Sequence, residues 1–446
     1  MTDQHIILYP YGLCNLRCSY CFIDKNKGLT EIDNLLKQSF EQENYYIDFI
    51  SKHYKPEEVK IIEFWGGEPT LGFDRLDKTL TQILEKYYLI DEIQFSSNFT
   101  TSSFIKDIES LFNIFKKFPT RNFLIDIQMS YDGPGELTNK CRGKNVAERV
   151  KENYVSLVLF LKENYENYKN LKFRIHNKPT ISIDSLRLLG KSDEHILEYW
   201  RDMQFFTSFM RENGVKNTFY DCCFLTMAAP SPWTQEDGIF FKHFCERSKY
   251  LYDLYKEDFQ DVSHFVPYFR FQDIYDHNND LSYLYRQYGI CGIGLKQAGF
   301  MPNNVISSCH STYVDLVEDY QKEISKDIKD FSIIVDSFFS GQKNIMTYPE
   351  EQHKDFKQIL QNFADDNIVQ VYTIAAEINQ LAKVGLVERK YENEELAFRA
   401  AAMLMIILPV CFRDRYNAVG CIGGMNTGEL KLYLNGALEI IIDEQL

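Results

Sequence analysis

The chain contains no run of about 18 or more uninterrupted apolar residues. Its N-terminus, MTDQHIILYP, lacks the basic start and the apolar run of a secretory signal. Basic side chains are in the minority, because 49 Lys and Arg stand against 64 Asp and Glu, which gives a formal net charge of -15. Nucleic acid binding depends mainly on clustered Lys and Arg. We therefore expect a cytoplasmic protein with neither nucleic acid nor a membrane as partner.

Disulfide-rich and histidine-rich classes of protein are also excluded. A reduced cytoplasm would keep the 11 Cys residues as free thiols, metal ligands or redox groups. The nine His residues form no cluster, and the chain has no internal repeat or low-complexity tract. At 446 residues, it is long enough for an α/β barrel and one or two smaller parts.

Strand-like and helix-like segments alternate through the first 230 residues. Strands separated by helices pair in parallel through right-handed crossovers, so the pattern predicts an α/β fold with an open or closed barrel. The expected strands are 5–11, 60–67, 92–98, 123–132, 171–176 and 217–225, and the expected helices are 31–53, 73–88, 102–117, 145–168 and 193–213.

The alternation ends near residue 230, which suggests three parts: a core barrel over 1–230, a helical connecting region over 231–290, and a C-terminal domain over 291–446. The third part starts with a Gly-rich, hairpin-like segment at 291–309. A mostly helical region is expected over 311–408. Two strand-like runs, ELKLYLNG and ALEIIID, follow with Asn-Gly between them as a turn signal.

Three cysteines, Cys14, Cys18 and Cys21, lie within eight residues directly after the first expected strand. On a loop at the C-terminal end of a barrel strand, three thiolates can bind three irons of a four-iron cluster and leave the fourth iron open. The alternative is a zinc site, which would need a second ligand pair, and the next cysteine along the chain is only Cys141. The spacing favours the iron-sulfur cluster.

This CxxxCxxC arrangement, with the aromatic Tyr20 before the third cysteine, resembles the signature of radical S-adenosylmethionine (SAM) enzymes. The resemblance covers roughly residues 5–230 and implies a partial (β/α)6, TIM-like barrel. It also implies a 4Fe-4S cluster with an open iron site, SAM chelated to that iron, and Tyr20 among the cofactor-binding residues. An electron from a flavodoxin- or ferredoxin-type donor would cleave SAM to a 5′-deoxyadenosyl radical that abstracts hydrogen from the substrate.

Gly66, Gly67, Glu68 and Pro69 follow the second expected strand and resemble the family's GGEP motif. In that motif, backbone carbonyls and the Glu bind the ammonium group of SAM, and glycines let the backbone approach a ligand closely. A tight turn between a strand and a helix would use the same residues. Both interpretations stay open at this point.

Two further motifs end the third and fourth expected strands. Ser97 and Asn98 lie where the family commonly has a Ser-Asn or Thr-Asn pair that reaches the ribose hydroxyls, although a helix N-cap is an alternative. SYDGP, followed by Arg142, resembles the SLDGP segment and downstream Arg of peptide-modifying enzymes such as anaerobic sulfatase-maturating enzymes. The resemblance implies that Ser130 meets the ribose, that Asp132 belongs to the cofactor site, and that Arg142 binds the methionyl carboxylate.

A second cysteine set lies in the C-terminal part. Cys291 and Cys309 flank a segment that resembles the first hairpin of SPASM and twitch domains, with Asn304 where that pattern usually has Gly; Asn is the next best residue at positive φ. With Cys411 and Cys421 they would make four ligands for one auxiliary 4Fe-4S cluster. The alternative is that all four are buried apolar cysteines and that the hairpin holds no metal.

Other candidates carry weaker signals. Cys222 and Cys223 are adjacent on an expected strand, so at most one can face the barrel interior and donate hydrogen to a substrate radical. An inert core thiol is the alternative for both and for Cys245. His176 follows a strand and could face the cavity or have a structural role.

The leading functional hypothesis is a radical SAM maturase that crosslinks or oxidises a peptide of the ribosomally made, post-translationally modified class (RiPP). The SYDGP segment and the SPASM/twitch-like C-terminal domain support it. A second hypothesis is an epimerase or dehydrogenase that acts on a peptide or small metabolite. A third is a non-catalytic protein with a structural or sensing cluster. No residue is assigned as the catalytic acid or base.

Overall fold

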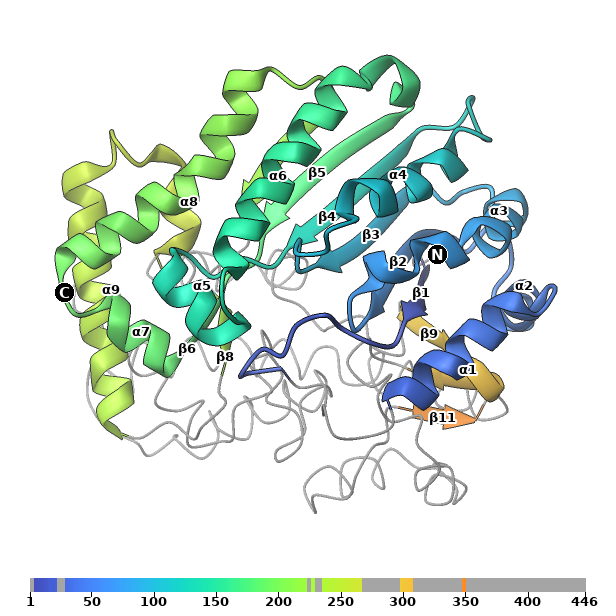
Figure 1. The fold of residues 1–446 in the computed structure, drawn as a ribbon, viewed down its shortest axis with the longest axis horizontal. Helices are drawn as coiled ribbons and strands as arrows, with labels where there is room; N and C mark the ends of the chain where they lie inside the picture. The colour runs from blue at the N-terminus through green and yellow to red at the C-terminus, as the bar shows by residue number, and fades with distance from the viewer. Residues whose placement is uncertain are drawn as a thin grey trace, which may run out of the picture.

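The computed structural model describes residues 4–21, 29–222, 226–228, 235–266, 297–307 and 347–349. Their strands are β1 (Gln4–Tyr11), β2 (Val59–Gly66), β3 (Glu92–Ser97), β4 (Phe123–Met129), β5 (Leu171–Asn177), β6 (Thr180–Ser182), β7 (Thr218–Cys222), β8 (Thr226–Ala228), β9 (Gln297–Met301), β10 (Val305–Ser307) and β11 (Thr347–Pro349). The main sheet has the order β11-β10-β9-β1-β2-β3-β4-β5-β7, and β6 pairs with β8. The seven strands from β9 to β7 run parallel (Figure 1).

The expected α/β fold with parallel strands is confirmed. The first five expected strands are β1 to β5, and their observed bounds differ from the expected ones by three residues at most. The sixth is β7, and the remainder of that expected strand, 223–225, lies outside the described residues. Alternation of apolar and polar residues identified these strands because their apolar side chains pack against helices on one face of the sheet.

The helices are α1 (Leu29–Glu41), α2 (Tyr45–Ser51), η1 (Pro69–Arg75), α3 (Asp77–Lys86), α4 (Phe104–Phe115), α5 (Gly135–Arg142), α6 (Val146–Glu163), η2 (Tyr165–Tyr168), α7 (Ile183–Leu189), α8 (Asp193–Asn213), α9 (Gln235–Tyr255), η3 (Gln260–Phe265) and η4 (Pro302–Asn304), where η marks 3-10 helices. The described helices include none that is both long and apolar enough to cross a membrane. α8 ends at Gly214, whose φ of +58 suits a residue without a side chain.

Several helices of the structure differ in extent from those expected from the sequence. The segment expected over 31–53 is two helices, because Asn44 between them adopts a left-handed conformation with φ 63. The segment expected over 73–88 starts earlier, as the 3-10 helix η1, and α5 was not expected at all. Short-range periodicity does not show such breaks, since they depend on single residues and on neighbouring elements.

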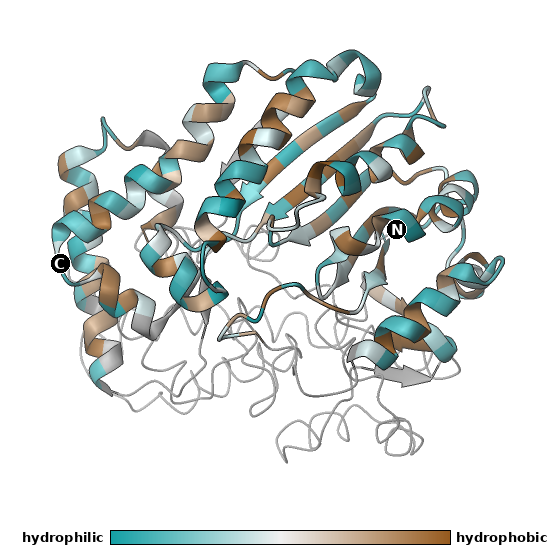
Figure 2. Cartoon of the chain, viewed as in Figure 1, coloured by the Kyte–Doolittle hydropathy of each residue, from teal (hydrophilic) through white to brown (hydrophobic). Residues whose placement is uncertain are grey.

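The two faces of the sheet differ in chemistry. Helices α4 and α6 lie over one face of β3, β4 and β5 (Figure 1), and the strand residues on that face are buried and apolar: Ile62, Phe64, Ile93, Phe95, Ile125, Ile127, Phe173 and Ile175. Strand register places Glu63, Gln94, Asp126 and Arg174 side by side on the opposite face. The resulting alternation is visible as brown and teal bands along the strands in Figure 2. We call this second surface the polar face.

A hairpin far along the chain completes the sheet next to β1. β9 pairs in parallel with β1, and β10 returns antiparallel to β9. The turn between them contains Asn304 at φ 55, which confirms the expectation of positive φ at that position. The Tyr45 hydroxyl of α2 donates to the Met301 carbonyl at 2.8 Å and accepts from the Asn304 N–H at 3.0 Å.

The hairpin expected over 291–309 is therefore present over its described part, 297–307, whereas its pairing with β1 was not expected from the sequence. β11 is a strand inside the region expected to be mostly helical, and α9 and η3 lie in the expected helical connecting region. The expected final strands over 429–443 lie outside the described residues.

Phe300 anchors the hairpin, because it is fully buried and its ring meets Phe49 at 5.0 Å and Tyr54 at 5.9 Å. We predict that Phe300→Ala lowers the free energy of unfolding by about 3–5 kcal/mol, from lost burial and the cavity left behind. Urea unfolding of the reconstituted protein measures this. Tyr88→Ala, at a side chain that is 58% exposed, is the control and should change little. If Phe300→Ala has the same free energy of unfolding as the wild type, the hairpin is not docked on α2.

Candidate active site at the carboxyl ends of the strands

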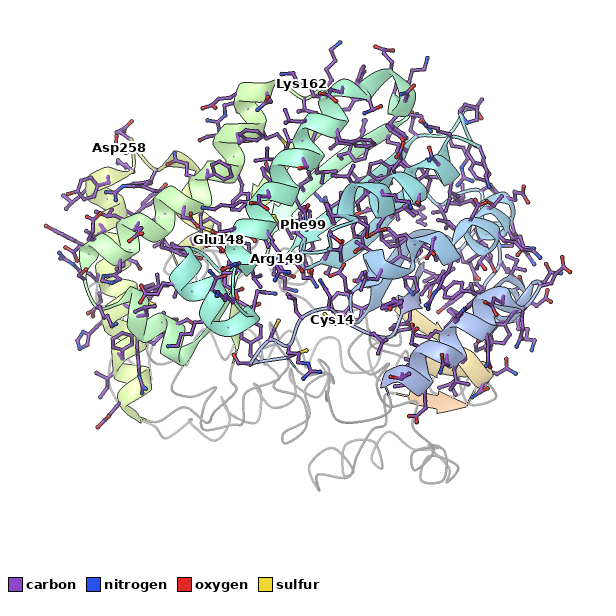
Figure 3. All side chains as sticks on the ribbon, viewed as in Figure 1. Cys14, Phe99, Glu148, Arg149, Lys162 and Asp258 are labelled. Atoms are coloured by element: carbon purple, nitrogen blue, oxygen red, sulfur yellow. The ribbon has the colours of Figure 1, made fainter. Side chains whose placement is uncertain are left out.

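The cysteine loop, residues 12–21, leaves the C-terminal end of β1, and Figure 3 labels Cys14 on it. The thiols of Cys14, Cys18 and Cys21 are partly buried. The sulfur of Cys14 accepts hydrogen bonds from the Leu16 N–H at 3.4 Å and from Asn98 Nδ2 at 3.6 Å. Burial, reinforced by the charge of Glu68, raises the pKa of Cys14 to about 12. A thiol in this position ionises readily only beside a bound cation.

Two glycines at the end of β2 allow the backbone of this loop to pass close to the backbone of β2. A Cβ on Gly66 would lie 2.2 Å from the Tyr11 carbonyl oxygen, and a Cβ on Gly67 would lie 2.1 Å from the Leu13 carbonyl oxygen. The same carbonyls accept the N–H groups of Gly67 at 3.1 Å and Glu68 at 2.8 Å. Gly66 also has φ +134. What the GG pair accommodates in this structure is therefore the backbone of the cysteine loop.

Glu68 lies at the centre of the site and is almost fully buried. Its carboxylate accepts the Ser97 hydroxyl at 2.8 Å, the Asn98 N–H at 2.7 Å, and both the hydroxyl and N–H of Thr70 at 2.8 and 3.3 Å. Burial raises the pKa of Glu68, and these hydrogen bonds oppose the shift. Pro69 follows as the first residue of η1, where its missing N–H costs nothing.

Asn98 connects the end of β3 to the cysteine loop. Its Nδ2 donates to Asn15 Oδ1 at 2.8 Å as well as to Cys14, and Asn15 Nδ2 donates to the Thr100 hydroxyl at 2.9 Å. The next residue, Phe99, is buried with φ 55, an unusual conformation for a bulky side chain. The residues expected at the ribose, Ser97 and Asn98, are thus bonded to Glu68 and to the loop.

A buried ion pair holds the other side of the loop. Arg142 Nε and Nη2 donate to the two oxygens of Asp132 at 2.7 and 2.8 Å, and the Tyr20 hydroxyl donates to the same carboxylate. The Thr180 N–H is a fourth donor, at 2.9 Å. Burial holds the pKa of Tyr20 well above its usual value, so its hydroxyl remains a donor. The Arg142 guanidinium also lies 5.4 Å from the centre of the Tyr20 ring.

This pairing changes how Arg142 is interpreted. The resemblance implies a bond from Arg142 to a methionyl carboxylate, yet here two of its donors are bonded to Asp132, which was expected only as a cofactor-site residue. Ser130 lies at the end of β4, and its N–H donates to the Ser97 carbonyl at 2.9 Å. The Ser19 N–H donates to the Cys141 carbonyl at 2.8 Å. The loop is therefore held by β3, β4 and α5 together.

Sequence reasoning missed Asn15, Thr100 and Thr180 as parts of this site. Asn15 could have been suspected because it directly follows Cys14, but the other two have no motif to mark them. The four cysteines proposed for an auxiliary cluster, Cys291, Cys309, Cys411 and Cys421, lie outside the described residues, as does Cys223. Cys245 is fully buried in α9, and His176 donates from Nδ1 to Asp126 at 2.9 Å.

The donor set fits a cluster with SAM beside it. In the described part of the chain, no three Cys, His, Asp or Glu side chains are arranged to hold a single metal ion. A four-iron cluster makes a different demand, since each thiolate binds its own iron. N–H donors to a ligand sulfur, as at Cys14, are a usual means of tuning such clusters. Cys14, Cys18 and Cys21 would hold the cluster, and Glu68 would be the carboxylate nearest to the cofactor.

In a comparison with protein families, residues 8–170 match the family described as the Radical SAM superfamily. No curated protein matches the chain. The chain thus carries a radical SAM superfamily domain over 8–170, the part that contains the cysteine loop and the strands β1 to β4. Such a domain implies a 4Fe-4S cluster, bound SAM, reductive cleavage of that SAM, and radical chemistry.

Gly67→Ala tests the crossing of the loop over β2. The new Cβ would meet the Leu13 carbonyl at 2.1 Å, so the loop must move. We expect a loss of about 1–3 kcal/mol of stability and iron content well below that of the wild type after reconstitution. Gly135→Ala is the control, because its nearest neighbour would be a side-chain atom at 3.3 Å. Equal iron in all three proteins would contradict this account.

Asp132→Asn tests the buried ion pair, whose side chains are 7% and 2% exposed. The substitution leaves Arg142 buried without its counterion, so we predict a loss of about 3–5 kcal/mol in unfolding free energy. The matched control is Asp193→Asn, which breaks a similar two-point pair with the exposed Arg247 and should have little effect. Chemical unfolding of both variants makes the comparison, and similar losses would refute the prediction.

Proposed function

We propose that this protein is a radical SAM enzyme that abstracts hydrogen from a peptide and so crosslinks it or oxidises a side chain. The observation that carries the proposal is the hairpin β9–β10. Its turn keeps a positive φ at Asn304, where the peptide-modifying branch usually has Gly, and its strand pairs with β1, from which the cysteine loop leaves. The resemblance of the SYDGP segment and Arg142 to that branch supports the same substrate class.

Cluster and SAM together supply an electron and a carbon-centred radical when bound. The chain's own contribution is to hold the loop between two buried carboxylates. Glu68 fixes the ends of β2 and β3, and Asp132 fixes β4 and α5 against Tyr20. Rigid donors of this kind keep a reactive site in one geometry and limit side reactions with water.

An electron-donor protein and a second cluster complete the proposal. A flavodoxin- or ferredoxin-type protein would deliver the electron to the cluster. A single auxiliary 4Fe-4S cluster would be held by Cys291, Cys309, Cys411 and Cys421. Cys309 follows the last residue of β10, Ser307, by two positions in the sequence.

Anaerobic incubation with SAM and dithionite tests the chemistry. We predict 5′-deoxyadenosine and methionine from the wild type and none from a variant with Cys14, Cys18 and Cys21 all changed to Ala. Iron analysis of that variant tests the auxiliary cluster: about four irons per chain would support it, and none would refute it. Absence of 5′-deoxyadenosine from the wild type would overturn the enzymatic proposal.

Co-expression with short Cys- or aromatic-rich peptides encoded beside the gene tests the substrate class. A crosslinked or oxidised peptide should lose the mass of two hydrogen atoms, seen by mass spectrometry. The triple Ala variant is again the control. If the wild type leaves every peptide intact and changes a small metabolite in a cell extract, the alternative of a metabolite dehydrogenase or epimerase replaces the peptide proposal.

A further inference from the structure

The polar face is unusual for a sheet of this kind. Parallel sheets are normally covered on both faces, and their strands are then apolar on both sides. Here the face opposite the helices carries Glu63, Gln94, Asp126, Arg174 and His176. Burying such groups costs free energy unless each has a partner. A surface that keeps so many of them is suited to a polar ligand.

On β3, β4 and β5 these groups bind one another. Arg174 pairs with Asp126 and, at 3.0 Å, with Glu92. Asp126 also accepts from His176 at 2.9 Å, and the other ring nitrogen of His176 lies 3.2 Å from Gln128 Nε2. Each group in this half has a charged or hydrogen-bonding neighbour within the sheet. The side chains on this half of the polar face are therefore held in place by one another.

On β1 and β2 the arrangement is looser. His5 Nε2 and Glu63 Oε2 lie 3.4 Å apart, with side chains 14% and 13% exposed. In the described part of the chain, Glu63 pairs with His5 and is influenced by the charge of Lys178, whereas Glu68 accepts four hydrogen bonds. Glu63 lies four residues before Gly67 on the same strand, so it is about 13 Å along the strand from the crossing of the cysteine loop.

Near neutral pH the surroundings keep His5 uncharged and leave Glu63 divided between its protonated and ionised forms. The pKa of Glu63 is raised to about 7, mainly by burial, with the charge of Lys178 opposing the shift and that of Asp126 adding to it. Burial lowers the pKa of His5 to about 4. Among the residues that the structure describes, the ionisable groups that face Glu63 are His5 from β1, Asp126 from β4 and Lys178 after β5, with Glu92 and Arg174 on the same face. A carboxyl group in this state can accept or give a proton at physiological pH.

We propose that Glu63 is the catalytic acid–base residue, which exchanges a proton with a substrate bound on the polar face. This inference rests on the proposed function. Bound SAM would supply the radical that removes one hydrogen atom from the substrate, and the Glu63 carboxylate would then accept a proton from the resulting substrate radical, whose electron would return to the cluster that SAM cleavage had oxidised. The product has two hydrogen atoms fewer than the substrate. His5 is a positioning residue that holds the Glu63 carboxyl group.

Infrared spectroscopy of the holoenzyme tests the protonation of Glu63 without SAM or substrate. We expect a carboxylic acid band that disappears between about pH 6 and pH 8 and is absent from Glu63→Gln. Glu92→Gln is the matched control, because Glu92 lies on the same face but is paired with Arg174. Its spectrum should keep the band. A wild type without this band would overturn the proposal.

Thermal unfolding of the holoenzyme gives an independent readout. Folded Glu63 holds its proton to about pH 7, whereas the unfolded chain releases it near 4.5, so this group destabilises the fold increasingly as pH rises between these values. His5 has the opposite effect between about pH 4 and 6.5. The difference in Tm between Glu63→Gln and wild type isolates Glu63, and it should become more positive by a few degrees from pH 5 to pH 8. A constant difference would count against the proposal.

Product analysis, with a peptide that the wild type modifies, tests the catalytic role of Glu63. We expect Glu63→Gln to lower the ratio of product to 5′-deoxyadenosine by a factor of about 10 or more. Glu63→Asp should recover part of that ratio. An unchanged ratio in Glu63→Gln would refute the role. If the wild type cleaves SAM but modifies no peptide, the peptide substrate is wrong, and the infrared result still decides whether Glu63 holds its proton.

Discussion

A single buried carboxylate, Asp132, fixes the relative positions of the elements around the site. Its oxygens accept from Arg142 on α5, from Tyr20 on the cysteine loop and from the backbone at Thr180 in β6. A buried charge without partners costs several kcal/mol, so a carboxylate here requires all of these donors to remain in place. The end of β4, α5, β6 and the loop are consequently held as one unit.

The loop itself has no regular secondary structure, and its shape depends on what it contacts. The Glu68 N–H and the Asn98 side chain bind it on the side of β2 and β3. On the side of β4, Asp132 accepts from its Tyr20 hydroxyl and Arg142 lies over the Tyr20 ring. The close backbone crossing at Gly67 leaves little freedom between these two sides. A radical enzyme benefits from such constraint, because a reactive intermediate in a rigid site has fewer side reactions.

The two faces of the sheet differ in role, because one is part of the apolar core and the other carries the polar and ionisable groups. Side chains beneath the helices form the apolar core, and the opposite face carries ion pairs and the His5–Glu63 pair. The core sets the positions of the strands, and the strands set which polar groups meet. The pairing across the polar face is uneven, close on β4 and β5 and looser on β1 and β2.

The sequence by itself determined the strand order along the chain, the α/β class, the cysteine loop and the GGEP, Ser-Asn and SYDGP positions, because these depend on local periodicity and short spacing. Only the tertiary structure decided that Arg142 pairs with Asp132, that Asn15 and Asn98 meet, that β9 joins β1, and that Glu63 lies beside His5. These contacts join residues distant in sequence, and their partners are selected by packing and by the need to satisfy buried charges. No local pattern encodes that selection.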